Sequence, residues 1–111
     1  MDALRKNNRP EAKIQKAVME KLKINDWYVK STHGNIYQAG FPDLFCAHKK
    51  YGSRWAEVKN PLSYSFTPAQ RENFLLMAAA GVPIYVITSA DQVPDIFFKP
   101  QNLIFFLEIM K

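Results

Sequence analysis

The chain has 111 residues, of which 48% are hydrophobic and 23% are charged, and this composition is typical of a folded protein rather than a disordered segment. Its 15 Lys and Arg residues outnumber the 10 Asp and Glu residues, and the net charge of +5 favours polyanionic partners such as nucleic acid. A single cysteine, Cys46, excludes an internal disulfide and a four-cysteine zinc site, while the lack of an apolar run of about 18–20 residues excludes a membrane span.

The first predicted element is an amphipathic helix over about residues 9–24. Pro10 suits the first turn of a helix, and Ile14, Val18 and Leu22 recur at a spacing of four residues, as on one buried face. Residues 25–26 break this pattern, and the aromatic and β-branched residues 27–32 are typical of a strand. Two short strand candidates, 43–47 and 54–59, then flank a polar stretch, and this arrangement predicts a β-hairpin.

The second half of the chain starts with a helix at Thr67. Thr67, Pro68 and Gln70 match an N-cap, a first-turn proline and a capping-box glutamine, and Gly81 is placed to end the helix. The apolar run 82–88 predicts a strand covered on both faces. The sequence pattern of residues 89–111 does not distinguish a helix from a strand. The order of elements predicts an α/β fold in which helices flank a central mixed sheet, and the length predicts one domain over residues 1–111.

The most informative side chains lie on the predicted hairpin. If its turn centres on Lys50, Asp43 lies opposite Glu57, with about 5 Å between the Cβ atoms. Lys59 then projects on the same face as Glu57, whereas a register shifted by one residue would place Asp43 on the other face. Two opposed carboxylates repel each other, and a hard divalent cation such as Mg²⁺ would compensate and activate a water against a phosphodiester. The alternative is a strand-start aspartate beside a solvated Glu-x-Lys strand face.

Pro42-Asp43 followed by Glu57-Val58-Lys59 resembles the motif of the PD-(D/E)xK phosphodiesterases, the restriction-endonuclease-like nucleases. The chain is similar in particular to their VRR-NUC branch, the virus-type replication-repair nuclease module. This similarity runs from Gly40-x-Pro-Asp, through the E-V-K-x-P stretch at 57–61 and the Thr-Pro-Ala-Gln helix start, to the glycine at 81 and the apolar strand after it. Asn60 departs from the pattern, because a glycine is expected after the lysine, and we expect it to alter the turn more than the chemistry.

The resemblance implies a restriction-endonuclease-like core and a metal-dependent, structure-selective DNA endonuclease in its stand-alone form, with Mg²⁺ or Mn²⁺ as cofactor. The implied site residues are the metal-binding Glu11, Asp43, Glu57 and Val58 (through its backbone carbonyl), together with the catalytic Asp43, Glu57, Lys59 and Gln70. Other interpretations of two of them stay open. A glutamate in the first helical turn is stabilised by the helix dipole in any protein, and Gln70 could serve only the capping box.

Basic residues outside the motif are candidates for contact with DNA, namely Lys13, His33, Lys49, Lys50 and Arg54. The last three are expected to form a basic hairpin tip that contacts the DNA backbone, although a solvated turn and a solvated loop histidine are the alternatives. Cys46 is expected in the core.

The apolar run 102–110 is expected to complete the core or to form a homodimer surface. Stand-alone members of the branch resemble Holliday-junction resolvases, so a homodimer acting on branched DNA is implied. With a polar start that excludes a secretory signal, we expect a cytoplasmic location in a bacterium or a virus-infected host cell. Two rival functions remain: a nucleic-acid-binding module with an inactive nuclease fold, and an interaction subunit of a replication or repair complex.

Overall fold

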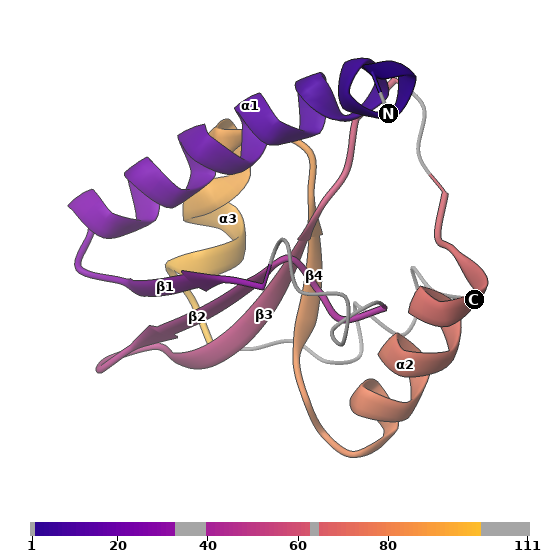
Figure 1. Ribbon diagram of the computed structural model, residues 1–111. Helices are drawn as coiled ribbons and strands as arrows, with labels where there is room; N and C mark the ends of the chain where they lie inside the picture. The colour runs from indigo at the N-terminus through magenta and orange to yellow at the C-terminus, as the bar shows by residue number, and fades with distance from the viewer. Residues whose placement is uncertain (1, 33–39, 63–64, 101–111) are drawn as a thin grey trace.

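The computed structural model describes residues 2–32, 40–62 and 65–100, and of residues 2–9 it describes the backbone alone. Its centre is a four-stranded sheet in the order β1-β2-β3-β4 (Figure 1). The strands are β1 (Tyr28–Ser31), β2 (Leu44–His48), β3 (Gly52–Val58) and β4 (Ile84–Ile87). The first three strands pair antiparallel and β4 pairs parallel to β3. The predicted central mixed sheet is therefore confirmed.

Helices cover both faces of this sheet (Figure 1). On one face, α1 (Asp2–Ile24) and α3 (Val93–Phe97) bury Val18, Leu22 and Phe97 against strand residues such as Ala56 and Val58. On the other face, α2 (Pro68–Ala79) buries Phe74 and Ala78 against Ile84. Because side chains alternate along a strand, Trp55 and Glu57 of β3 belong to the α2 side, whereas their neighbours Ala56 and Val58 belong to the α1 side.

The helix ends follow from local sequence. Asp26 has a φ of 68° at the end of α1, and the N–H of Trp27 donates to the carbonyl of Leu22, so that a left-handed residue closes the helix. Gly81, at a φ of 89°, closes α2 in the same manner, with the N–H of Val82 donating to the carbonyl of Met77. The predicted ends of both helices are confirmed.

The predicted start of α1 is wrong, because the helix begins at Asp2 and Pro10 lies inside it. A proline lacks the N–H of an interior helical residue and normally marks a first turn. The polar residues before Pro10 carry no apolar period, so their pattern could not indicate a helix. The last described elements are a short 3-10 turn (Ala90–Gln92) and the helix α3 that follows it. Residues 101–111, which include the predicted dimer surface, lie outside the described part.

The β2–β3 hairpin has the predicted register. Leu44 pairs with Ala56 and His48 pairs with Gly52, which has a φ of 85° that favours glycine in the turn. The register places Asp43, directly before β2, opposite Glu57 near the end of β3. Of the helices in the described ranges, none is both long and apolar enough to cross a bilayer.

Candidate active site

Two carboxylates face each other where strand β2 begins and strand β3 ends. The backbone N–H of Val58 donates to Oδ2 of Asp43 at 2.8 Å, and the backbone N–H of Asp43 donates to Oε1 of Glu57 at 3.2 Å. These two hydrogen bonds hold both side chains in a fixed orientation relative to the hairpin backbone. Glu57 is only 2% exposed, so it has little access to the water that would normally stabilise its charge.

Burial changes the ionisation of this pair. Removal from water, followed by the repulsion of the Asp43 charge, raises the pKa of Glu57 from 4.5 to about 8, while the nearby Lys59 ammonium acts in the opposite direction. Glu57 therefore favours its protonated form near neutral pH unless further positive charge lies close to it. Such a pair has the electrostatic character expected of a cation site or an acid–base site.

Lys59 and Gln70 complete a network around Glu57. Nζ of Lys59 lies 3.2 Å from Oε2 of Glu57 and donates to Oε1 of Gln70 at 3.1 Å. The amide nitrogen of Gln70 donates to Oε2 of Glu57 at 2.8 Å. Gln70 also forms the predicted capping box with Thr67, whose N–H donates to the same Gln70 oxygen at 3.0 Å. The capping box of Gln70 is confirmed, and its third position in α2 also points the side chain toward the hairpin, while its catalytic role stays a prediction.

Glu11 of α1 approaches the same region from the other face of the sheet. Its Oε1 accepts a hydrogen bond from the backbone N–H of Asn60 at 3.3 Å. The side chain of Asn60 in turn accepts from the N–H of Leu62 at 3.0 Å, so this residue shapes the turn after Lys59, as expected from its departure from the motif.

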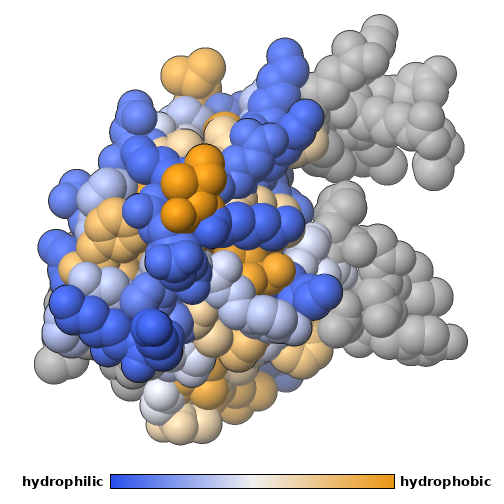
Figure 2. Space-filling model, turned by 90° about the vertical axis from the view of Figure 1, so that its left-hand side faces the viewer, coloured by the Kyte–Doolittle hydropathy of each residue, from blue (hydrophilic) through white to orange (hydrophobic). Residues whose placement is uncertain are grey.

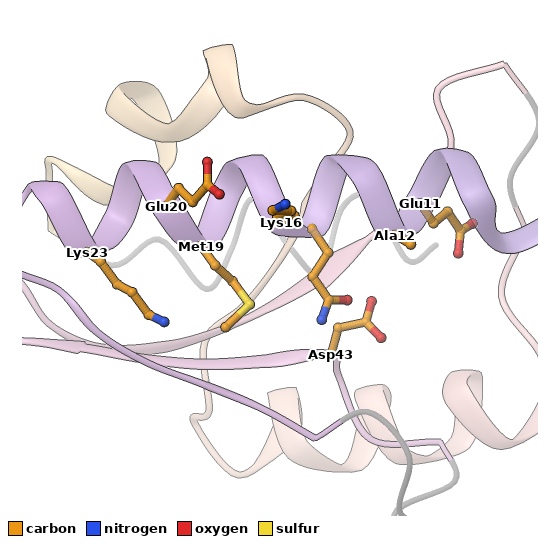
Figure 3. A pocket seen from close by; sticks show the side chains of 8 residues that line it. Glu11, Ala12, Lys16, Met19, Glu20, Lys23 and Asp43 are labelled. Carbon is orange, nitrogen blue, oxygen red and sulfur yellow. The ribbon is translucent and has the colours of Figure 1, made fainter.

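A groove of about 440 Å³ runs along α1 and ends at Glu11 and Asp43. Figure 3 shows both carboxylate side chains at one end of this groove and Lys23 at the other. Its described lining consists of Glu11, Ala12, Gln15, Lys16, Met19, Glu20, Lys23 and Asp43. The groove therefore gives the carboxylates of Glu11 and Asp43 access to solvent and to ligands.

The side chains of Asp43 and Glu57 offer oxygen atoms as metal ligands, and oxygen ligands suit a hard divalent cation. Within the described ranges no three His, Cys, Asp or Glu side chains gather closely enough to form a complete metal site. Mg²⁺ is commonly bound by one or two carboxylates while it keeps several waters, so the Asp43–Glu57 pair fits this ion without a third acid. The metal-binding roles of Asp43, Glu57, Glu11 and the Val58 carbonyl all remain predictions.

Comparison with solved structures shows one similar chain, described as "VRR_NUC domain". It superposes with a TM-score of 0.64 at 23% sequence identity, over 80% of this chain and 95% of that chain. The chain has the fold of a VRR_NUC domain. The VRR-NUC resemblance and the α/β fold class inferred from the sequence are thus confirmed at the level of the fold. No protein-family model matches the sequence, and no curated protein matches it.

Within this VRR_NUC fold, the predicted DNA-contact residues are scattered. Lys13 is exposed on α1, two residues from Glu11. Lys49 and Lys50 are exposed in the hairpin turn, at the opposite end of β2 and β3 from Asp43 and therefore about 20 Å from it at roughly 3.3 Å per residue. The end of the molecule that carries this turn faces the viewer in Figure 2, where hydrophilic residues predominate. His33 lies outside the described residues.

The prediction for Arg54 is wrong, because its side chain is completely buried. The guanidinium donates to the carbonyl oxygens of Ile96 at 2.6 Å and Tyr51 at 2.7 Å, and it lies over the ring of Trp27 at 5.2 Å. Arg54 pairs with the buried Cys46 in the hairpin register, so side-chain alternation indicates its inward position better than its charge does. Cys46 itself is buried as predicted.

Proposed function

We propose that this chain is a metal-dependent endonuclease that hydrolyses phosphodiester bonds in DNA. The observation that supports this function best is the mutually repelling pair of the half-buried Asp43 and the buried Glu57, with the ammonium of Lys59 3.2 Å from Glu57. Hydrolysis of a phosphodiester needs compensation of negative charge at the scissile phosphate and an activated water. The VRR_NUC fold is consistent with this chemistry.

Each side chain has a separate role in the proposal. Asp43 and Glu57 supply carboxylate oxygens for Mg²⁺ or Mn²⁺, assisted by Glu11 and by the backbone carbonyl of Val58. The bound cation would polarise the phosphate and lower the pKa of a coordinated water. Lys59 donates a hydrogen bond to the attacking water or to the phosphate oxygen on which charge develops.

Gln70 acts through its neighbours. One end of its amide donates to Glu57 and the other accepts from Lys59, so it keeps the carboxylate and the ammonium at a fixed separation. The capping box of α2 holds this amide in turn. We therefore infer that the start of α2 serves as a rigid support for the catalytic pair.

The proposed substrate is branched or junction DNA, cut by a homodimer in the cytoplasm. Lys13 would contact phosphates close to the site, whereas Lys49 and Lys50 would require a duplex that extends about 20 Å from it, or roughly six base pairs. The apolar run 102–110 is the proposed dimer surface. Sedimentation equilibrium tests the dimer, and a monomer mass that does not change with concentration would contradict it.

Cleavage assays with labelled four-way junction, flap, single-stranded and duplex DNA test the substrate, each with Mg²⁺, Mn²⁺ or EDTA. We expect cutting that requires the metal ion and that favours a branched substrate, and RNA versions of the same strands test the choice of nucleic acid. Binding without cutting under every metal condition would support the alternative, a nucleic-acid-binding module with an inactive nuclease fold. Activity that appears only with a co-purifying protein would favour the interaction subunit.

A further inference from the structure

The start of α2 presents a second side chain to Lys59 besides Gln70. Phe66 directly precedes the N-cap residue Thr67, and the centre of its ring lies 5.2 Å from Nζ of Lys59. This distance is within the range of about 6 Å at which an aromatic face attracts a cation. We propose that Phe66 is a positioning residue for Lys59, whose ring face keeps the ammonium against Glu57 and Gln70. The inference rests on the proposed function of Lys59.

The surroundings of the ammonium explain why a ring is suited to this task. Lys59 is 7% exposed, so its charge has lost most of its water. Of its three N–H donors, Glu57 and Gln70 account for two. An aromatic face attracts the charge through its quadrupole rather than through a lone pair, and the third donor can therefore bond to a phosphate oxygen or a water.

Phe66 is itself held in place by the core. Its ring packs edge-on against Phe74 at 6.0 Å and 74°, and Phe74 is completely buried in α2. Both rings belong to the cluster that joins α2 to β4. A flexible lysine stem can occupy many rotamers, and a ring anchored in this way reduces the number of positions that the ammonium can take.

The test compares Phe66→Leu, which removes the ring but keeps an apolar side chain, with Phe66→Tyr, which keeps the ring. Phe98→Leu serves as the matched control, because this half-buried phenylalanine stacks on Tyr51 in the other core cluster. Two readouts are used. Steady-state cleavage gives kcat and KM, and NMR follows the Hε and Cε resonances of Lys59, which are assigned by their loss in Lys59→Arg.

We expect the Hε resonances of Lys59 to lie upfield of the other lysines, through the ring current of Phe66, and to show cross-peaks to its ring protons. Phe66→Leu is expected to remove both signals and to lower kcat about 2- to 30-fold with little change in KM, which corresponds to a cation–π contribution of roughly 0.5–2 kcal/mol at 1.36 kcal/mol per tenfold change. Phe66→Tyr and Phe98→Leu should retain the Lys59 signals and most of the activity.

The inference is overturned if the wild-type Lys59 resonances show no ring-current shift, or if Phe66→Leu leaves them unchanged. Equal losses of kcat in Phe66→Leu and Phe66→Tyr would also overturn it. If Phe66→Leu fails to fold, the spectra of the wild type and of Phe66→Tyr decide, because they need only the intact ring. A wild-type protein that cuts no DNA contradicts the proposed function, and the resonances then still decide whether Phe66 holds Lys59.

Discussion

Replacing Glu57 by glutamine is expected to stabilise the metal-free protein, because the folded state holds this carboxylate in an unfavourable environment. In the unfolded chain Glu57 ionises near pH 4.5, whereas in the folded protein burial and Asp43 raise its pKa to about 8. The folded state therefore binds the proton more tightly than the unfolded state between these two values. By linkage, the contribution of Glu57 to stability is fully present below about pH 4.5 and is lost as the pH rises to about 8.

The size of the effect follows from the gap between the two pKa values. Each pH unit in this window costs the folded state about 1.4 kcal/mol, so the penalty at pH 7 is on the order of 3 kcal/mol. The amide of Glu57→Gln keeps the shape and carries no charge to desolvate. We expect the variant to be more stable than the wild type by about 1–3 kcal/mol at pH 7 in EDTA, since some hydrogen-bond geometry is lost.

Urea denaturation from pH 5 to pH 9 in EDTA measures this difference, with Glu72→Gln as the matched control on the exposed surface of α2. The free-energy gap between Glu57→Gln and the wild type should widen as the pH rises to about 8, and it should stay near zero for the control. Mg²⁺ at 100 times its dissociation constant should then stabilise the wild type by about 2.7 kcal/mol, and the variant less. A variant that is less stable than the wild type at pH 8 would refute the reasoning.

Three further predictions separate the network from its scaffold. Gln70→Ala should lower both the cleavage rate and the free energy of unfolding. Thr67→Ala should lower the free energy of unfolding by about 0.5–2 kcal/mol through the lost cap and should retain kcat. An equal loss of kcat in the two variants would contradict this prediction. Arg54→Ala should cost roughly 2–6 kcal/mol in urea denaturation, because two part-buried carbonyls lose their donor, while Lys50→Ala on the surface should change stability by less than about 0.5 kcal/mol. Burial raises the pKa of Cys46 to about 12, so a thiol reagent at pH 8 should modify this residue only in the unfolded protein. Rapid modification of the native protein would contradict this prediction.

Much of the geometry of the candidate active site could be predicted from the sequence, because this geometry is local. The hairpin register follows from the position of the turn, and side-chain alternation then places Asp43, Glu57 and Lys59 together. The capping-box signature likewise placed Gln70 on the first turn of α2. Short-range rules of this kind do not require knowledge of how distant elements pack.

The features that could not be predicted depend on tertiary packing. Phe66 meets Lys59 because α2 packs against one face of the sheet, and no spacing in the sequence encodes that contact. The burial of Arg54 was missed because positive charge normally indicates the surface. Its partners Trp27, Tyr51 and Ile96 come from three separate segments of the chain. Helix α1 extends before Pro10 without any apolar period, so only the structure shows its start.

Single-turnover cleavage of a labelled branched DNA by the wild type and by Lys59→Ala, in Mg²⁺ and in EDTA, tests the central claim most directly. Lys99→Ala, at an exposed lysine for which no DNA contact is proposed, controls for the loss of one positive charge. The account predicts metal-dependent cleavage by the wild type and by Lys99→Ala, and loss of cleavage in Lys59→Ala with the fold intact. Cleavage by Lys59→Ala at the wild-type rate, or none by the wild type in any divalent metal, would contradict it.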